Sequence, residues 1–208
     1  MITWQVAHHR VAVGGRVTNS ETGLPIYGAE VAITESPEAF KQRLQSASLL
    51  HDKRWAAMAD RPGTTRTRDD GLFYFLDLPD GNYSFAASLP GSGKRFGLAQ
   101  QKATVSRDDK GNTKVAVVNF SLQPTAVKGK VTGPRHKSGV VLAEVRVKSS
   151  GERTFTDERG QYTVSGIEPG KRVLLVSAQG YRSESQSFTV NEPGTSQTVN
   201  FNLTPENG

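Results

Sequence analysis

The sequence predicts an all-β fold made of two tandem β-sandwich domains, the first of which carries a helical insertion. Three observations predict it. The 208 residues are lean and rich in turn formers, with 35% hydrophobic residues, 21 Gly and 10 Pro, as is typical of short strands joined by many turns. Apolar and polar residues alternate over short runs, which indicates strands with one buried face. The pattern of residues 1–124 then recurs in residues 125–208.

The repeat begins and ends with matching strand motifs. "VGGRVT" at 13–18 matches "VKGKVT" at 127–132, and "VNFSLQP" at 118–124 matches "VNFNLTP" at 199–205. In the first motif, Val13 and Val17 alternate with polar positions, so one face of the strand is expected to be buried. Order, spacing and residue class all recur, which indicates a tandem duplication.

A turn motif lies at the centre of each copy. "RDDGLFYFLDLPDG" at 68–81 recurs more loosely as "DERGQYTVSGIEPG" at 157–170. The Asp residues can bond neighbouring backbone amides, and Gly71 and Gly160 can adopt a positive φ, so each motif predicts a β-hairpin turn. This interpretation gives the acidic residues a structural role and no catalytic or calcium-binding one.

The first copy contains an insertion, "ESPEAFKQRLQSASLLHDKRWAAMADRPG" at 35–63, that the second copy lacks. Ser36 and Pro37 are typical of a helix start, so we expect helical structure at about 36–62, as one helix or as two with a break near Ser46–Ser48. Its apolar stripe either packs on its own sandwich and covers a sheet edge, or docks a partner protein. In the second case the contacts would come from Phe40, Leu44, Trp55 and Met58.

The N-terminal segment has no counterpart before the second copy. Ile2, Trp4 and Val6 alternate with more polar residues, which is a strand-like pattern. The segment could pair with its own domain, lie free as an arm, or add a strand to the sheet of a neighbouring subunit. These three residues are therefore further candidates for partner binding.

Taken together, the motifs resemble a known family. The motifs are "GRVTNSETGLPIYGAEVAI", "TRTRDDGLFYFLDLPDGNYSFAAS" and "VVNFSLQP" in the first copy, and "GKVTG", "AEVRV", "TFTDERGQYTVSGIEPGKRVLLVSAQGY" and "VNFNLTP" in the second. They are similar to the carboxypeptidase regulatory-like, or transthyretin-like, β-sandwich family in two tandem copies. The resemblance implies Greek-key sandwiches and a non-catalytic role as spacer, adaptor or recognition surface.

Composition argues against several classes of function. The net charge of +6 is spread along the chain instead of being concentrated with aromatics, which argues against nucleic-acid binding. There is no Cys and the four His are scattered, so we expect no disulfide, no metal site and no cofactor. No acid–base set is recognisable, so no catalytic residue is predicted and the chain is not expected to be an enzyme. No export signal and no run of about 18 apolar residues is visible, which favours a cytoplasmic protein without membrane insertion.

The function expected from these observations is that of a structural or adaptor protein, with protein partners in a multi-subunit assembly. The most specific form of this expectation is an accessory component of a phage-tail-like contractile injection particle, assembled in the cytoplasm and released with the particle. The alternative is a carbohydrate-binding module that would use the aromatic residues Tyr27, Phe96 and Tyr181. Phe96 and Tyr181 match within the repeat, which favours a shared core role for those two.

Overall fold

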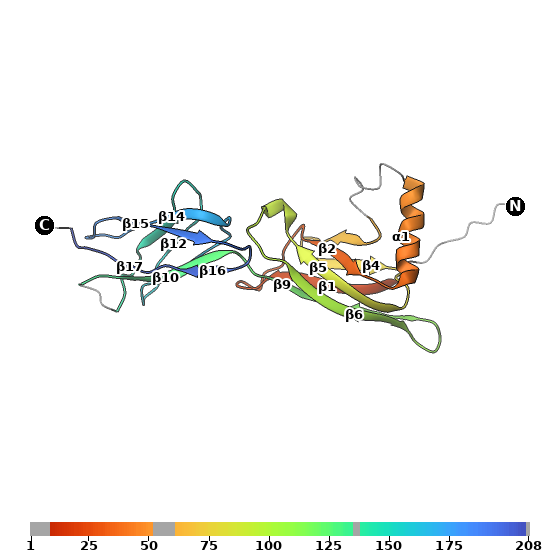
Figure 1. Ribbon diagram of the computed structural model, residues 1–208. Coiled ribbons are helices and arrows are strands. Elements are labelled where there is room, and N and C mark those ends of the chain that lie inside the picture. The colour runs from red at the N-terminus through yellow and green to blue at the C-terminus, as the bar shows by residue number, and fades with distance from the viewer. Residues whose placement is uncertain (1–8, 52–60, 135–137, 207–208) are drawn as a thin grey trace. The chain divides into compact units, whose positions relative to one another are not determined.

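The structure, a computed structural model, describes residues 9–51, 61–134 and 138–206 and confirms the all-β prediction (Figure 1). The chain divides into two compact units. Unit 1 comprises the chain up to Gly91 together with Leu98–Leu122, and unit 2 comprises Ser92–Gly97 together with the chain from Gln123 onward. Each unit contains two β-sheets, and the first also contains the predicted helix.

The described residues of unit 1 form nine strands. One sheet has the order β4-β1-β8, with β9 also paired to β1, and the other has the order β3-β2-β5-β6-β7. The strands are β1 (Val11–Asn19), β2 (Glu30–Glu35), β3 (Thr64–Arg66), β4 (Leu72–Leu76), β5 (Gly81–Ser88), β6 (Ala99–Arg107), β7 (Thr113–Lys114), β8 (Ala116–Val117) and β9 (Phe120–Leu122). Aromatic rings fill the space between the sheets: Phe75 on β4 lies 5.4 Å from Phe85 on β5 of the other sheet, and Phe73 on β4 lies 5.8 Å from Phe120 on β9 of the same sheet, between ring centroids.

Unit 2 has the corresponding strands in the same order. One sheet runs β13-β10-β16, with β17 also paired to β10, and the other runs β12-β11-β14-β15. The strands are β10 (Ala126–Thr132), β11 (Glu144–Val147), β12 (Arg153–Phe155), β13 (Gln161–Ser165), β14 (Gly170–Ser177), β15 (Glu184–Val190), β16 (Ser196–Thr198) and β17 (Phe201–Asn202). Tyr162 is buried in this core and donates its hydroxyl to the carbonyl of Val199 at 2.7 Å.

Both units bring their first and last strands together in parallel. β1 pairs with β8 and β9, and β10 pairs with β16 and β17. Matching asparagines hold these strands, since Asn119 Oδ1 accepts the Arg16 amide at 3.0 Å and Asn200 Oδ1 accepts the Lys130 amide at 2.9 Å. The repeated "VNF" motif is thus explained by strand pairing.

The repeated turn has the expected local geometry but a different place in the fold. The Arg68 amide donates to the Leu72 carbonyl at 3.0 Å, Asp70 Oδ1 accepts the Leu72 amide at 2.9 Å, and Gly71 has a φ of +75°. However, β3 and β4 belong to different sheets, so the predicted hairpin is wrong. The same holds in unit 2, where the turn lies between β12 and β13. The motif makes the corner at which the chain crosses from one sheet to the other.

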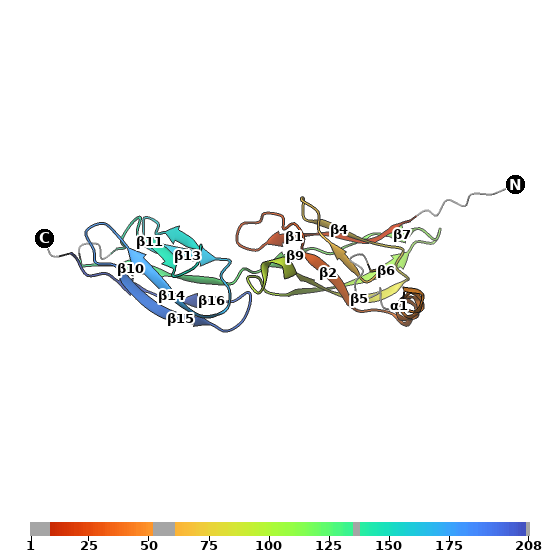
Figure 2. The same ribbon diagram turned by 90° about the horizontal axis from the view of Figure 1, so that it is seen from above.

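The insertion contains the helix α1 (Glu38–His51), which lies at one end of unit 1 in both views (Figures 1 and 2). It continues without a break through Ser46–Ser48. The hydroxyls there donate to carbonyls of the preceding turn, Ser46 to Gln42 at 3.0 Å and Ser48 to Gln45 at 2.8 Å, which leaves the helical backbone intact. The helix is anchored near its start, where the Phe40 ring meets Tyr83 edge-on at 5.8 Å.

Unit 2 includes six residues that precede its main segment in the sequence. Ser92–Gly97 begin at the last residue of the 3-10 turn η2 (Pro90–Ser92), between β5 and β6. The Arg95 guanidinium forms ion pairs with Glu152 and, at 3.5 Å, with Glu168, and Phe96 forms a β-bridge with Pro124. This segment is therefore part of unit 2 in both backbone and side-chain bonding.

Candidate functional site

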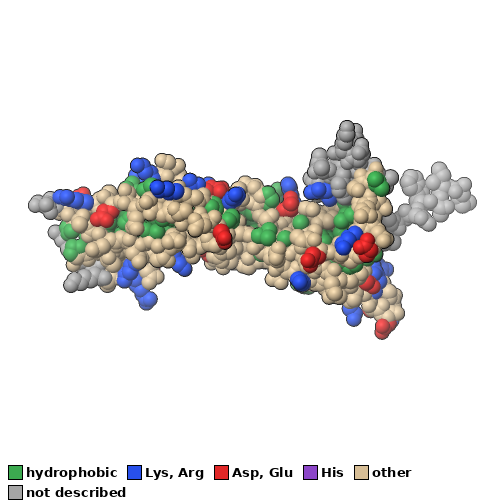
Figure 3. Space-filling model, in the orientation of Figure 1, with side chains coloured by type: hydrophobic (Ala, Val, Ile, Leu, Met, Phe, Trp, Pro, Cys, Tyr) green, Lys and Arg blue, Asp and Glu red, His purple; other side chains and the backbone are tan. Residues whose placement is uncertain are grey.

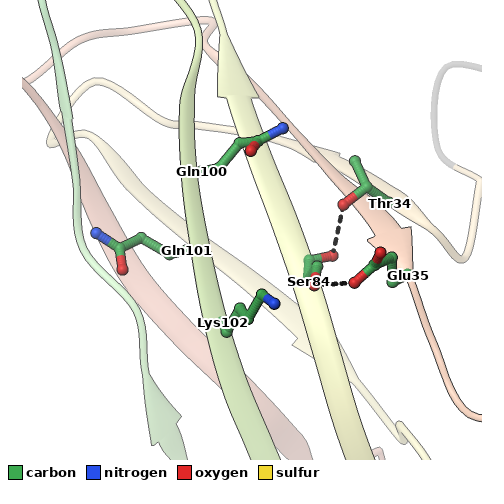
Figure 4. Close-up of a pocket in the computed structure, with 6 residues that line it drawn as sticks. All are labelled: Thr34, Glu35, Ser84, Gln100, Gln101 and Lys102. Carbon is green, nitrogen blue, oxygen red and sulfur yellow. Dashed lines mark hydrogen bonds between the residues drawn. The ribbon is translucent and has the colours of Figure 1, made fainter.

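The outer face of the β2–β5–β6 sheet in unit 1 carries a polar trough of about 630 Å³ (Figure 4). Ser84 on β5 lies at its centre: its hydroxyl donates to Glu35 Oε2 at 2.6 Å, and its carbonyl accepts the Thr34 hydroxyl at 3.1 Å. Gln100 and Lys102 from β6 lie on the other side of Ser84. The trough continues towards Asn82 and Thr104, which are also hydrogen bonded to each other, at 2.7 Å.

The trough offers hydrogen bonds but little reactive chemistry. Its only carboxylate among the described residues is Glu35, and its only ammonium is Lys102. The described residues that line it include no Ser–His or Cys–His pair and no exposed aromatic ring that could stack on a sugar. The trough is a solvated polar sheet face.

The outer face of the other sheet in unit 1 has the opposite character. Leu72, Tyr74 and Leu76 alternate along β4 and so point to one side, with Tyr74 39% and Leu76 47% exposed. Val11 lies opposite Leu76 on that side, and Val117 on β8 is 74% exposed. We call these five residues the apolar face.

Gly14 on β1 lies between the β4 residues of the apolar face and Val117 on β8. It lies opposite Tyr74 on β4 and opposite Val117 on β8, so all three share one side of the sheet. A Cβ at Gly14 would lie 3.3 Å from Tyr74 Cδ1, which shows that the tyrosine ring lies close over the glycine. The small residue leaves the ring room to extend across β1.

Unit 2 shows that the fold does not require an apolar surface at this place. Lys128 occupies the position of Gly14, between Thr163 on β13 and Thr198 on β16. The inward residues are apolar in both units, whereas the outward residues of β4 and β8 are apolar in unit 1 and their counterparts are polar in unit 2; on β1, the outward Arg16 is charged, as is its counterpart Lys130. The corresponding pairs are Leu72 and Gln161, Tyr74 and Thr163, Leu76 and Ser165, and Val117 and Thr198. The sandwich fold itself therefore does not require apolar residues at the positions of the apolar face.

Beside the apolar face, a groove runs between β4 and β3. Its two parts have volumes of about 370 and 380 Å³. Four arginines line it, Arg43, Arg61, Arg66 and Arg68, together with the apolar residues of β4. Among the described lining residues, the one carboxylate is Asp77, which is hydrogen bonded to His9. Arg43 Nη1 also donates to the Asp77 carbonyl at 2.7 Å.

The buried polar groups are structural. Thr67 and Thr156 occupy equivalent places: Thr67 donates to the Ile26 carbonyl at 2.6 Å and accepts the Ala29 amide at 2.9 Å. Thr156 makes the same pair of bonds with Val140 and Ala143. Tyr83 donates to the Pro79 carbonyl, and burial raises its pKa to about 12. Within the described ranges, no cluster of three or more His, Cys, Asp or Glu side chains could hold a metal ion.

The structure describes two of the predicted partner-binding residues, Phe40 and Leu44. Phe40 is 1% exposed and packs on Tyr83, so it belongs to the core of unit 1 and is unavailable to a partner. Leu44 is half-buried, 3.9 Å from where a Cβ on Gly63 would lie. The first turns of α1 thus pack on their own unit, as the simpler interpretation expected. Trp55, Met58, Ile2, Trp4 and Val6 lie outside the described residues.

The three aromatic residues of the carbohydrate alternative belong to different units and differ in exposure. Tyr27, in unit 1, is 70% exposed. Phe96 and Tyr181 belong to unit 2, where they form equivalent β-bridges with Pro124 and Pro205, and Tyr181 is only 5% exposed. The match between Phe96 and Tyr181 in the repeat is explained by this shared structural position.

Sequence reasoning missed the apolar face. The signal is present in the contrast between "LFYFL" at 72–76 and "QYTVS" at 161–165, since only the first is apolar at every position. Its interpretation needs the register in which Gly14 pairs with Tyr74 on one side and with Val117 on the other.

On the side of the molecule drawn in Figure 3, Lys and Arg are scattered among Asp and Glu and do not gather into one basic patch.

Comparison with known proteins finds a family match for part of the chain. Residues 126–204 match the family described as "Carboxypeptidase regulatory-like domain". This range runs from the start of β10 to just beyond β17, so it covers most of unit 2. A second copy of that domain in residues 1–124 stays a prediction. No curated protein sequence matches the chain.

Several solved structures are similar at low identity. A double mutant of the shaft pilin SpaA from Lactobacillus rhamnosus GG is 14% identical, with a TM-score of 0.43 over 96% of this chain and 98% of that one. A streptococcal ancillary pilin is 16% identical, with a TM-score of 0.38 over 93% of this chain and 62% of that one. A type II cohesin–X-dockerin complex from Acetivibrio cellulolyticus is 12% identical, with a TM-score of 0.34 over 39% of this chain and 58% of that one. The chain therefore spans less than two thirds of the latter two.

None of the helices in the described part of the chain has both the length and the hydropathy that a membrane crossing requires.

Proposed function

We propose that this chain is a non-catalytic structural or adaptor protein that holds another protein on the apolar face of unit 1. The observation that supports this is the contrast between the units: the outward residues of β4 and β8 are apolar in unit 1, and their counterparts in unit 2 are polar. Contiguous exposed apolar side chains lose contact with water when a partner covers them, and aromatic residues among them commonly serve as anchors. Tyr74, beside Gly14, is the expected anchor.

The residues of unit 2 supply a test that preserves the fold. The face variant carries Leu72→Gln, Tyr74→Thr, Leu76→Ser and Val117→Thr, which are the residues that unit 2 has at these places. The control variant carries Leu24→Ser, Tyr27→Thr and Leu98→Gln, which remove apolar side chains that are 64%, 70% and 63% exposed elsewhere in unit 1. Both variants are expected to unfold at about the temperature of the parent chain, because surface substitutions typically change stability by within about 0.5 kcal/mol each.

The measurement is affinity capture from lysate of the native host, with captured proteins identified by mass spectrometry. We expect the parent chain and the control variant to capture the same defined proteins, and the face variant to lose them. Capture of the same proteins by the face variant would place the binding surface elsewhere, and capture of nothing by the parent chain would argue against the adaptor function. An accessory place in a phage-tail-like contractile injection particle, and assembly in the cytoplasm, stay predictions from the sequence.

A further inference from the structure

The strand that carries the apolar face has an open backbone edge. β4 pairs with β1 on one side, and no described strand pairs with it on the other. The Gly71 carbonyl accepts the Val17 amide and the Asp77 amide donates to the Arg10 carbonyl, both at 2.9 Å, so alternate residues from 71 to 77 direct their backbone groups towards β1. The backbone groups of Tyr74 and Leu76 then point away from β1. These N–H and C=O groups form a template on which another strand can pair.

The groove described above lies along this open edge. β3 forms its opposite wall, because β3 and β4 are outer strands of the two sheets. Thr64, Thr65 and Arg66 come from that wall, and Leu72, Tyr74 and Leu76 come from β4. Together, the two parts of the groove follow β4 from Leu72 to Leu76. The space therefore follows the strand that offers the free backbone groups.

The charge of the groove indicates which side chains a strand bound there would carry. Four arginines line it, and the one carboxylate among its described residues, Asp77, already accepts hydrogen bonds from the Arg10 amide and the His9 ring. Arg66 has a partner in Glu30 at 3.6 Å, whereas no carboxylate within the described ranges forms an ion pair with Arg61 or Arg68. A peptide with acidic side chains would complement this lining, and guanidinium groups bind carboxylates well.

We propose that the partner binds as an extended strand along the open edge of β4, with alternating apolar and acidic side chains. This rests on the proposed function and names the partner's chemistry. Every second side chain lies beside Tyr74 and Leu76 and continues the apolar face, while the intervening ones point towards the arginines. The chain's own N-terminal segment, "MITWQVAH", contains no acidic residue, so its charge does not match this groove.

The test uses the full chain and a fluorescein-labelled peptide, Val-Glu-Val-Glu-Val-Glu-Val, with fluorescence anisotropy as the readout. Two further peptides probe the two kinds of contact: one with Lys in place of Glu, and one with N-methyl groups on alternate amides, which removes the hydrogen bonds of one strand edge. We expect saturable binding of the acidic peptide only. Binding should weaken about tenfold or more in the double variant Arg61→Gln, Arg68→Gln, because each charge-assisted contact contributes to affinity.

A matched variant in unit 2, Arg153→Gln with Arg159→Gln, removes the same charge from an exposed place and should leave the affinity unchanged. Absence of binding, or equal affinity for the N-methylated peptide, would overturn the strand-pairing proposal. If capture of host proteins were nevertheless lost in the face variant, the adaptor function would stand without it. Self-association that disappears on deletion of residues 2–7 would also overturn the proposal, because the occupant would then be a second copy of this chain.

Discussion

At the scale of single residues, two glycines make the parallel pairing of first and last strands sterically feasible. A Cβ at Gly15 would lie 1.6 Å from the Val118 carbonyl oxygen, and one at Gly129 would lie 1.7 Å from that of Val199. No side chain can move to relieve either overlap, because the obstructing atoms are backbone. The repeated glycine of "VGGRVT" and "VKGKVT" is explained by this approach.

Substitution of Gly129 by Ala is therefore expected to destabilise unit 2 by about 3 kcal/mol or more, since the strands must separate. Calorimetric unfolding of the full chain measures the loss. Gly151→Ala is the control, because a Cβ there has no atom within 4 Å, and its effect should stay within about 0.5 kcal/mol. Equal stability of the two variants would mean that the strands yield without cost.

Asp77 is expected to make the stability of unit 1 depend on pH in the acidic range. Its carboxylate accepts the Arg10 amide and is bonded to His9, and these contacts hold its pKa below the usual value of 3.8. A pKa that is lower in the folded state stabilises the fold above the unfolded pKa, and the contribution is lost as pH falls through the folded pKa. The difference in unfolding free energy between the parent chain and Asp77→Asn should therefore shrink as pH falls from about 5 towards 2.

Chemical denaturation at several pH values measures this difference. Asp69→Asn is the control, since Asp69 is an exposed residue of the turn before β4. Its difference from the parent chain should vary less with pH. A profile of Asp77→Asn that matched the control would show that the bonds to Arg10 and His9 carry no acid-sensitive stability.

At the scale of secondary-structure elements, α1 is attached to unit 1 through its first turns. Phe40 is fully buried against Tyr83, whereas Leu49, near the other end, is 83% exposed. Phe40→Ala should lower the stability of unit 1 by about 3–5 kcal/mol, as is usual for a buried Phe. Leu49→Ala should change it by less than about 0.5 kcal/mol. Thermal unfolding of both variants measures these effects. Equal unfolding midpoints for the two variants would show that the helix does not contribute to the core.

The strands were predictable from the sequence because alternation reports burial directly: Val13 and Val17 are both buried as expected. The partner of a strand was less predictable. The bonds within "RDDG" are local and were expected, but the sheet to which β3 belongs depends on its pairing with β2, which no local pattern encodes. Thr67 and Thr156 were also missed, because their bonds reach residues that precede them by 38 or more positions in unit 1 and 13 or more in unit 2.

At the scale of the whole molecule, the candidate site lies in a repeated part of the sequence. Sequence reasoning sought function in what was not repeated, the insertion and the N-terminal arm. The structure instead shows a difference inside corresponding strands, at Leu72, Tyr74, Leu76 and Val117. Such a difference becomes visible only when register identifies the outward positions, since the inward ones obey the same apolar rule in both units.

The six residues Ser92–Gly97 have a consequence for how the chain can evolve. They belong to unit 2 but are encoded in the middle of unit 1, so the backbone passes between the units three times. A gene segment for residues 123–208 alone would lack Arg95 and its ion pairs with Glu152 and Glu168. Recombination that moves unit 2 by itself would therefore yield an incomplete domain, and the two units are expected to be inherited and exchanged together, as one cassette.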